Sequence, residues 1–289
     1  MRSTPFSKFV IRTFAGLSVL ASGQALAQSA WTRPAGETLL QFSIERIGPY
    51  DEVFQDHGPD FVPGREITQT ALATYAEYGL KDDLTLIGSL AIQFLDTGSL
   101  NANATIPVPT ITSESETKLG NLVLGLRQQL ADDDYALAAQ LAFELPTGSL
   151  DRSSGLSSGL DAFTFLPTLS VGRGFGKSYA QAYLGAGLRT NDYSSDWRLG
   201  AEYGYRFDKL QLAFNVDLVE TLLAGSENSG ASNEQTALYV DQQEYLAFGF
   251  KGSYPLSPGV DLQAAARFAA SGKNVAKSPF ISIGISLHW

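Results

Sequence analysis

Two histidines limit the acid–base catalysis that this 289-residue chain can offer. His288 follows Ser286 by two residues, so both side chains would share one face of a C-terminal strand. A nucleophile–base pair of this kind also needs an orienting acid and an oxyanion hole. The sequence indicates neither of them near the pair. We therefore predict a packed or hydrated histidine and no catalytic residues.

The other histidine, His57, stands in an acidic stretch with Asp51, Glu52, Asp56 and Asp60. Carboxylates and a histidine can bind a divalent cation, but this spacing fits no known ligand template. We predict a solvated loop and no metal site.

A glycine-rich stretch at residues 172–178, Gly-Arg-Gly-Phe-Gly-Lys-Ser, is superficially similar to a phosphate-binding loop. Its first glycine lies one position too close to the Gly-Lys-Ser, and a strand pattern follows where a helix is required. The stretch is expected to form a turn, and we expect no cofactor.

Charged residues that alternate with apolar ones are the stronger functional candidates. The alternation places the charges on one face of a strand and the apolar side chains on the other. A charged face suits a wet channel whose wall contacts passing solutes. We predict solute contact for Arg127, Glu144, Arg198, Glu202, Arg206 and Arg267, with Arg189, Glu45 and Asp217 on the same face. The alternative is a charge network that fills the interior and conducts nothing.

The same alternation predicts the strands that would position these charges. In the last strand the odd positions from 281 to 289 are apolar, and the even positions are serine, glycine or histidine. Such segments have about ten residues, the length of a tilted membrane strand. Twelve are predicted, near 37–47, 66–79, 84–94, 117–130, 135–145, 161–173, 178–189, 195–207, 210–220, 238–252, 259–270 and 280–289. The fold class is therefore all-β, as a 12-stranded antiparallel transmembrane up-and-down β-barrel.

The connections between the strands alternate between short and long, as in barrels with short periplasmic turns and longer outer loops. The long loops are expected to fold over the outer mouth and set access. A soluble β-sandwich or lipocalin-like barrel would show the same periodicity. Charges on the polar face, aromatic residues near strand ends and the terminal Trp289 favour the membrane. We expect contact with outer-membrane lipid, and recognition by the barrel-assembly machinery through the C-terminal strand that ends in Trp289.

The first 27 residues are expected to be a cleavable signal peptide, which leaves residues 28–289 as the barrel. Positive residues precede an apolar stretch, and Ala25-Leu26-Ala27 fits the cleavage site. The formal net charge is −10. An acidic exported chain is a poor candidate for binding nucleic acid, and the absence of cysteine excludes disulfides.

Four pieces of the chain resemble the family of outer-membrane proteins named for the meta-pathway of phenol degradation. They are Tyr78-Gly79-Leu80, the strand at 119–127 (Leu-Gly-Asn-Leu-Val-Leu-Gly-Leu-Arg), Glu-Leu-Pro-Thr-Gly-Ser at 144–149, and Leu-Pro-Thr-Leu-Ser at 166–170. They lie between about Glu77 and Phe207, in the family's order. The resemblance implies transport of hydrophobic or aromatic compounds and brings no catalytic residues with it.

Together these observations predict a channel-like barrel in the cell outer membrane, through which small solutes pass. The family resemblance tilts the solute towards hydrophobic or aromatic compounds. Two alternatives stay open. One is a non-conducting structural or interaction barrel that acts through its outer loops, and the other is an outer-membrane hydrolase that uses Ser286 and His288.

Overall fold

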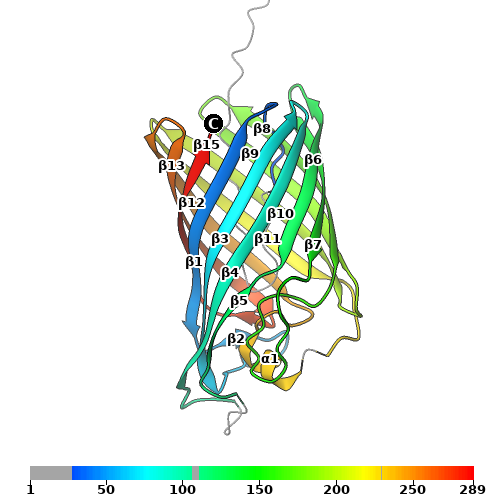
Figure 1. The fold of residues 1–289 in the computed structure, drawn as a ribbon, viewed down its shortest axis with the longest axis vertical. Coiled ribbons are helices and arrows are strands. Elements are labelled where there is room, and N and C mark those ends of the chain that lie inside the picture. Colours follow the sequence, from blue (N-terminus) through cyan, green and yellow to red (C-terminus); the bar gives the residue numbers. More distant parts are fainter. Residues whose placement is uncertain (1–27, 106–110, 229) are drawn as a thin grey trace, which may run out of the picture.

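A closed antiparallel barrel of twelve strands forms the body of the protein (Figure 1). The computed structural model describes residues 28–105, 111–228 and 230–289, so the expected signal peptide lies outside the described part. The wall strands are β1 (Thr38–Tyr50), β3 (Arg65–Lys81), β4 (Leu84–Leu100), β6 (Leu122–Asp132), β7 (Ala136–Leu145), β8 (Thr164–Phe175), β9 (Ser178–Arg189), β10 (Ser195–Phe207), β11 (Leu210–Leu223), β12 (Glu244–Ser257), β13 (Val260–Lys273) and β15 (Phe280–His288).

The barrel closes because β1 pairs with both β3 and β15, which leaves no open edge between the first and last strands. A short strand, β5 (Ser115–Leu119), precedes β6, and both pair with β4, so together they occupy one position in the wall. Closure matters because an unpaired backbone amide in lipid costs several kcal/mol. The predicted 12-stranded up-and-down barrel is confirmed.

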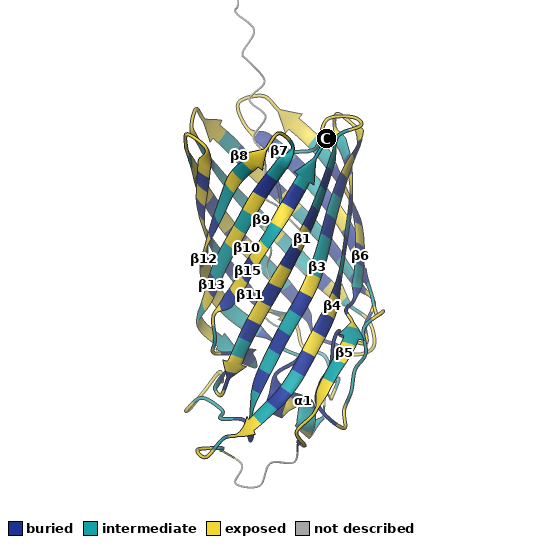
Figure 2. Cartoon of the chain, turned by 60° about the vertical axis from the view of Figure 1, so that its left-hand side comes forward, coloured by how far each residue is buried: buried dark blue, intermediate teal, exposed yellow. Residues whose placement is uncertain are grey.

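Buried and exposed residues alternate along the wall strands (Figure 2). The burial is inverted relative to a soluble protein, because large apolar side chains of the wall are exposed while many polar ones are buried. Along β15 the exposed fraction is 58% for Ile283 but 4% for Ser282 and 1% for Ser286. An exposed apolar belt around a polar interior is the arrangement of a barrel whose outer face contacts lipid. This inversion excludes the soluble sandwich, whose apolar face would point inward.

The two ends of the barrel differ, and the end with short turns is called periplasmic and the end with long loops outer, after the usual orientation of outer-membrane barrels. Short turns join β3 to β4, β6 to β7, β8 to β9, β10 to β11 and β12 to β13 at the end where β15 finishes (Figure 1). Thr38 at the start of β1 hydrogen-bonds the main chain of Trp289, so both ends of the wall lie there. In the glycine-rich stretch 172–178, only Gly176 and Lys177 form the β8–β9 turn, because residues 172–175 still belong to β8 and Ser178 begins β9.

The opposite end carries the long loops and some structure of its own. A two-stranded sheet pairs β2 (Val53–Phe54) with β14 (Val275–Ala276), and α1 (Ala231–Thr236) is a short helix. No helix in the described ranges is long and apolar enough to cross a membrane.

Two predicted strand starts were wrong. The strand predicted to begin at residue 238 begins at Glu244, because Ala237, Tyr239 and Gln242 have positive φ and the chain there turns instead of extending. The strand predicted to begin at residue 161 begins at Thr164.

Candidate functional site

Ion pairs that each reach across one intervening strand line the barrel lumen. Arg267 Nη2 lies 3.1 Å from Asp217 Oδ2. Lys251 forms an ion pair with Glu202. These four side chains are less than a tenth exposed. Buried charges persist when they are paired, so the wall is charged yet locally neutral.

A second charged group lies towards the outer loops, where two arginines share one carboxylate. Arg198 Nε donates to Asp196 Oδ1 at 2.6 Å, and Arg189 also donates to Asp196. This group therefore carries one net positive charge. Asp241 lines the same small cavity, and its carboxylate accepts hydrogen bonds from the main chain and hydroxyl of Ser194.

The third charged group lies near the periplasmic turns and is centred on Arg127, whose exposed fraction is 1%. Its Nη1 lies 3.0 Å from Glu77 Oε1, and its Nε donates to Gln140 at 3.1 Å. Tyr75 also donates to Glu77, at 2.6 Å. Because both charges are enclosed, removal of Glu77 would leave Arg127 without this carboxylate, and removal of Arg127 would leave Glu77 with Arg33 alone, in a poorly solvated site.

Two tyrosine rings lie flat against the inner wall over glycines of β10. A Cβ atom added to Gly204 would overlap the ring of Tyr179, and one added to Gly200 would overlap the ring of Tyr183. Each hydroxyl donates to a lumen carboxylate, Tyr179 to Glu202 at 2.6 Å and Tyr183 to Asp217 at 2.5 Å. The glycines are therefore required for close approach, and the lumen presents aromatic faces beside charged groups.

The segment Ser29–Ala35, which precedes β1, lies inside the periplasmic end of the barrel. Trp31 packs edge-on against Tyr179, with ring centroids 6.0 Å apart, and its ring occupies the space above Gly172. Arg33 Nε donates to Glu77 at 2.6 Å. Main-chain groups of the segment also bond the lumen side chains of Gln129, Arg127, Thr85 and Gln181. This end is therefore closed by the segment of the chain that directly precedes β1.

The opposite end is closed by the loops 146–163 and 224–243, which fold into the barrel. Leu156 and Leu238 are fully buried in an apolar cluster that also includes Tyr50 from β1. Gln93, on the inner face of β4, donates to the Tyr239 hydroxyl and to the Ser158 carbonyl. The long loops therefore reach into the barrel, which is more than the covering of the mouth that we expected.

The turn at the tip of the first of these loops is held by Asp151. Its carboxylate accepts from the main-chain amides of Ser153 at 2.9 Å and Ser154 at 3.1 Å, and from the Ser153 hydroxyl. Partial burial acts to raise the pKa of this carboxyl, but these hydrogen bonds outweigh it and hold the pKa well below its ordinary value. Asp151 is therefore ionised in the folded loop at neutral pH.

Two small cavities lie between the two closures. One cavity beside Arg198 and Asp241 has a volume of about 10 Å³, and one beside Lys251 and Asn215 has about 20 Å³. A cavity of about 10–15 Å³ holds one water molecule. Because segment Ser29–Ala35 fills one end and the long loops fill the other, the structure shows the barrel in a closed state.

Five of the six residues predicted to contact solute have side chains in the lumen, namely Arg127, Glu144, Arg198, Glu202 and Arg267. Arg206 has the same parity but lies at the periplasmic rim, half-buried, where its amide bonds the Lys177 carbonyl. Sequence analysis missed Glu77, Asp196, Lys251 and the two wall tyrosines. Lys251 alternates with Phe248 and Phe250, so parity alone could have found it.

The residues considered for catalysis or metal binding are His288, Ser286 and His57. His288 Nδ1 lies 3.7 Å from Asp261 Oδ2, so an acid does stand near the pair where we expected none, but this distance exceeds a hydrogen bond. The Ser286 hydroxyl accepts from Gln263 at 2.9 Å. His57 is almost fully exposed in its loop, with Nε2 3.7 Å from Asp56.

Comparisons with known proteins agree with this architecture. The family model described as "Putative MetA-pathway of phenol degradation" matches residues 50–283. The COG4313 outer membrane channel from Pseudomonas putida F1 is similar in structure, with a TM-score of 0.67 and 16% identity over 92% of this chain and 100% of that one. The NanC porin gives a TM-score of 0.51 at 8% identity, over 86% and 98% of the two chains. The translocator domain of the autotransporter NalP from Neisseria meningitidis gives 0.52 at 10% identity, over 89% and 90%. No curated protein matches the chain.

Proposed function

The chain belongs to the family of the putative MetA-pathway of phenol degradation, and on that premise we propose that its outer-membrane barrel conducts small solutes, phenol-like aromatic ones among them. The observation that carries the proposal is the composition of the inner wall, where ion pairs and amides alternate with tyrosine rings. A hydroxylated ring finds both partners that it needs there, an aromatic face and a hydrogen-bonding group.

The residues proposed to contact solute are Arg127, Glu144, Arg198, Glu202 and Arg267 in the lumen, and Arg206 at the periplasmic rim. Wholly apolar compounds fit this lumen poorly, because they would displace water from charged groups without replacing its hydrogen bonds. A phenolic hydroxyl offers such a replacement. The solute class that we propose is therefore narrower than the hydrophobic compounds expected from the resemblance alone.

Passage requires movement at both ends. The periplasmic closure Ser29–Ala35 is a short segment without regular structure, held by hydrogen bonds and by Trp31. The outer closure is a packed apolar cluster. Since extended segments open more readily than packed cores, we propose that the periplasmic closure is the more labile of the two.

A non-conducting barrel is the second candidate, and the closure of both ends favours it. In that case the outer loops would be the binding surface of the protein, and the charged network in the lumen would only stabilise the wall. The two candidates differ in one observable, which is whether opening the ends creates a conducting path.

The experiment is current block in planar bilayers, with a variant that lacks residues 28–35 and has residues 226–241 replaced by a short Gly-Ser linker. Phenol is expected to reduce the ionic current more than cyclohexanol, which has a similar size and a hydroxyl but no aromatic face. Arg198→Ala is expected to shift the ion selectivity towards cations. Equal block by both alcohols would refute the aromatic preference, and a folded variant without current would favour the non-conducting barrel.

We also propose that the C-terminal strand, ending in the exposed Trp289, is the segment recognised by the barrel-assembly machinery. Trp289→Ala is expected to lower the amount of folded barrel in the membrane while the purified variant still refolds in detergent.

A further inference from the structure

An apolar trough lies on the lipid-facing wall, across strands β8 to β11. Two cross-strand rows build it, Val171–Ala182–Ala201–Val216 and Arg173–Ala180–Tyr203–Phe214. The alanines form a low floor between larger flanking side chains, and the trough has a volume of about 480 Å³. This volume lies within the range of about 300–1,000 Å³ that is usual for small-molecule sites.

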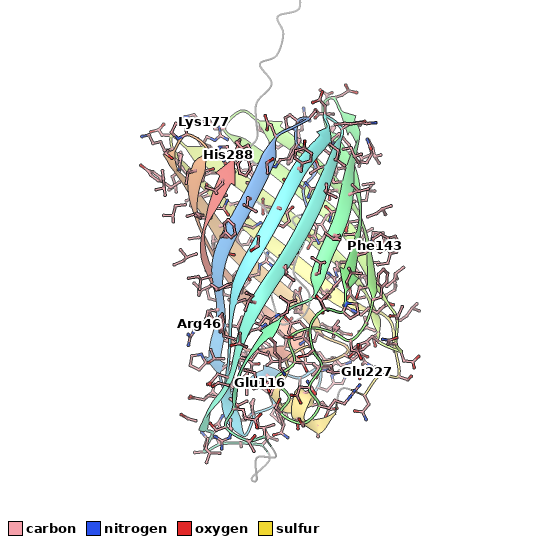
Figure 3. The ribbon with its side chains drawn as sticks, in the orientation of Figure 1. Arg46, Glu116, Phe143, Lys177, Glu227 and His288 are labelled. Carbon is pink, nitrogen blue, oxygen red and sulfur yellow. The ribbon has the colours of Figure 1, made fainter. Side chains whose placement is uncertain are left out.

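The trough is closed towards the outer loops and ends in a positive charge towards the periplasm. The next row on the side of the outer loops is Leu169–Leu184–Leu199, whose side chains are all exposed to lipid and much larger than alanine. On the periplasmic side lie Arg173 and the turn with Lys177, which Figure 3 shows at the same end of the barrel as His288. The trough is therefore apolar along its length and positively charged at its periplasmic end.

Arg173 is held in place by aromatic residues. Its guanidinium carbon lies 4.8 Å from the ring centroid of Tyr135 and 5.5 Å from that of Phe175, and Nη1 donates to the Tyr135 hydroxyl at 3.0 Å. Within the described ranges, no carboxylate forms an ion pair with Arg173. A guanidinium has five N–H donors, so most of them stay available to a further acceptor while the ring contacts fix the plane of the group.

A cation on the lipid-facing wall needs a compensating partner. Charge in the apolar band costs free energy, and the cost falls near the interface, where an arginine can reach the headgroups. Guanidinium groups bind phosphate with paired hydrogen bonds, and the trough beneath supplies apolar surface for a hydrocarbon chain. A phosphate attached to an acyl chain satisfies both halves of the site.

We propose that this trough binds one glycerophospholipid of the periplasmic leaflet, with its phosphate on Arg173 and one acyl chain over Ala180, Ala182 and Ala201. The leaflet follows from the position of Arg173, next to the short β8–β9 turn. A lipid held at this point stabilises the strands that carry Tyr179, Tyr183 and Glu202 on their inner face.

Native mass spectrometry tests the proposal on the delipidated mature barrel, titrated with phosphatidylglycerol. One tightly bound lipid is expected for the natural sequence. Arg173→Gln is expected to weaken its binding by about tenfold to a hundredfold, the usual effect of losing hydrogen bonds to a charged group. Arg173→Lys keeps the charge and should restore part of this loss. Ala182→Phe fills the trough and should weaken binding although Arg173 is intact.

Matched controls use lipid-facing residues elsewhere on the barrel. Arg46→Gln removes an outward arginine from β1, at the other end of the wall (Figure 3), and Ala264→Phe enlarges an outward alanine of β13. Both should leave the affinity unchanged. Heat-modifiable gel mobility confirms that each variant is folded.

Four results would overturn the proposal, three of them from lipid binding and one from competition. The first three are unchanged affinity in both Arg173→Gln and Ala182→Phe, equal losses in the two controls, and diacylglycerol binding as tightly as phosphatidylglycerol. Competition by inorganic phosphate at equal concentration would also overturn it, because the site would then be a free-anion site and not a lipid site.

Discussion

Replacement of Trp31 by alanine should make the periplasmic end of the lumen open more often. The indole ring is half-buried between Tyr179 and the backbone at Gly172. Its removal should lower the docking free energy of the N-terminal segment by about 2 kcal/mol, the scale for burying one large apolar side chain. Since 1.4 kcal/mol corresponds to a factor of ten, the ratio of displaced to docked segment should rise by about 30-fold.

The chain has no cysteine, so a single introduced thiol reports on this opening without background. Ser170 suits the purpose because its side chain faces the lumen, is 3% exposed, and lies two residues deeper than Gly172 on β8. In Ser170→Cys, labelling by a maleimide measures the open population when closing is faster than labelling. Adding Trp31→Ala should raise the labelling rate by about 30-fold.

The matched control is Trp197→Ala, which removes a tryptophan from the outer face of β10 and should leave the labelling rate unchanged. An unchanged labelling rate in Trp31→Ala would refute the reasoning, because the indole ring would then contribute nothing to the docking free energy of the segment. An equal rise in Trp197→Ala would refute it as well, because it would indicate general loosening of the barrel.

Three further predictions concern the wall and the outer loop. Arg127→Ala leaves Glu77 buried beside Arg33 alone and should lower the free energy of unfolding by about 3–5 kcal/mol, measured by urea denaturation in lipid vesicles. Gly200→Ala should cost about 1–3 kcal/mol in the same assay because its Cβ displaces the Tyr183 ring, whereas Gly88→Ala, whose Cβ would have ordinary contacts, should cost less. The pKa of the Asp151 carboxyl is lower in the folded loop than in the unfolded chain, where it is about 3.9. The stabilisation of the loop by this carboxylate is therefore fully present above the unfolded pKa and is lost as the pH falls through the folded pKa. Proteolytic nicking of loop 146–160 should therefore increase below about pH 4 in the natural sequence, and Asp151→Asn should remove this pH dependence; an identical pH profile in the two proteins would contradict it.

The wall of the barrel could be predicted from the sequence because apolar and polar residues alternate within each single strand. Every second residue of β15 or β11 faces outward, and lipid strongly favours apolar side chains there, so each strand shows the alternation within its own sequence. The same parity is enough to place Arg127 and Glu202 in the lumen. It does not show which charges pair, because pairing depends on the register between strands such as β10 and β11.

The periplasmic closure could not be predicted, and the outer loops were expected only to cover the mouth, for a physical reason. Ser29–Ala35 has no periodicity, and its position depends on lumen side chains such as Gln129 and Glu77, which come from distant strands. Residues 237–240 (Ala-Leu-Tyr-Val) form an apolar run shortly before β12, and all four are buried. Their burial comes from packing inside the barrel, which a local pattern cannot distinguish from burial in a wall.

The central claim is that the lumen becomes a conducting path when its closures are displaced. Single-channel recording in planar bilayers tests it directly on three forms, namely residues 28–289, the form without residues 28–35, and the form that also has residues 226–241 replaced by a linker. We predict rare brief openings for the first, more frequent openings for the second and a stable open conductance for the third. A third form that is folded and inserted, as shown by heat-modifiable mobility, but passes no current would contradict the account.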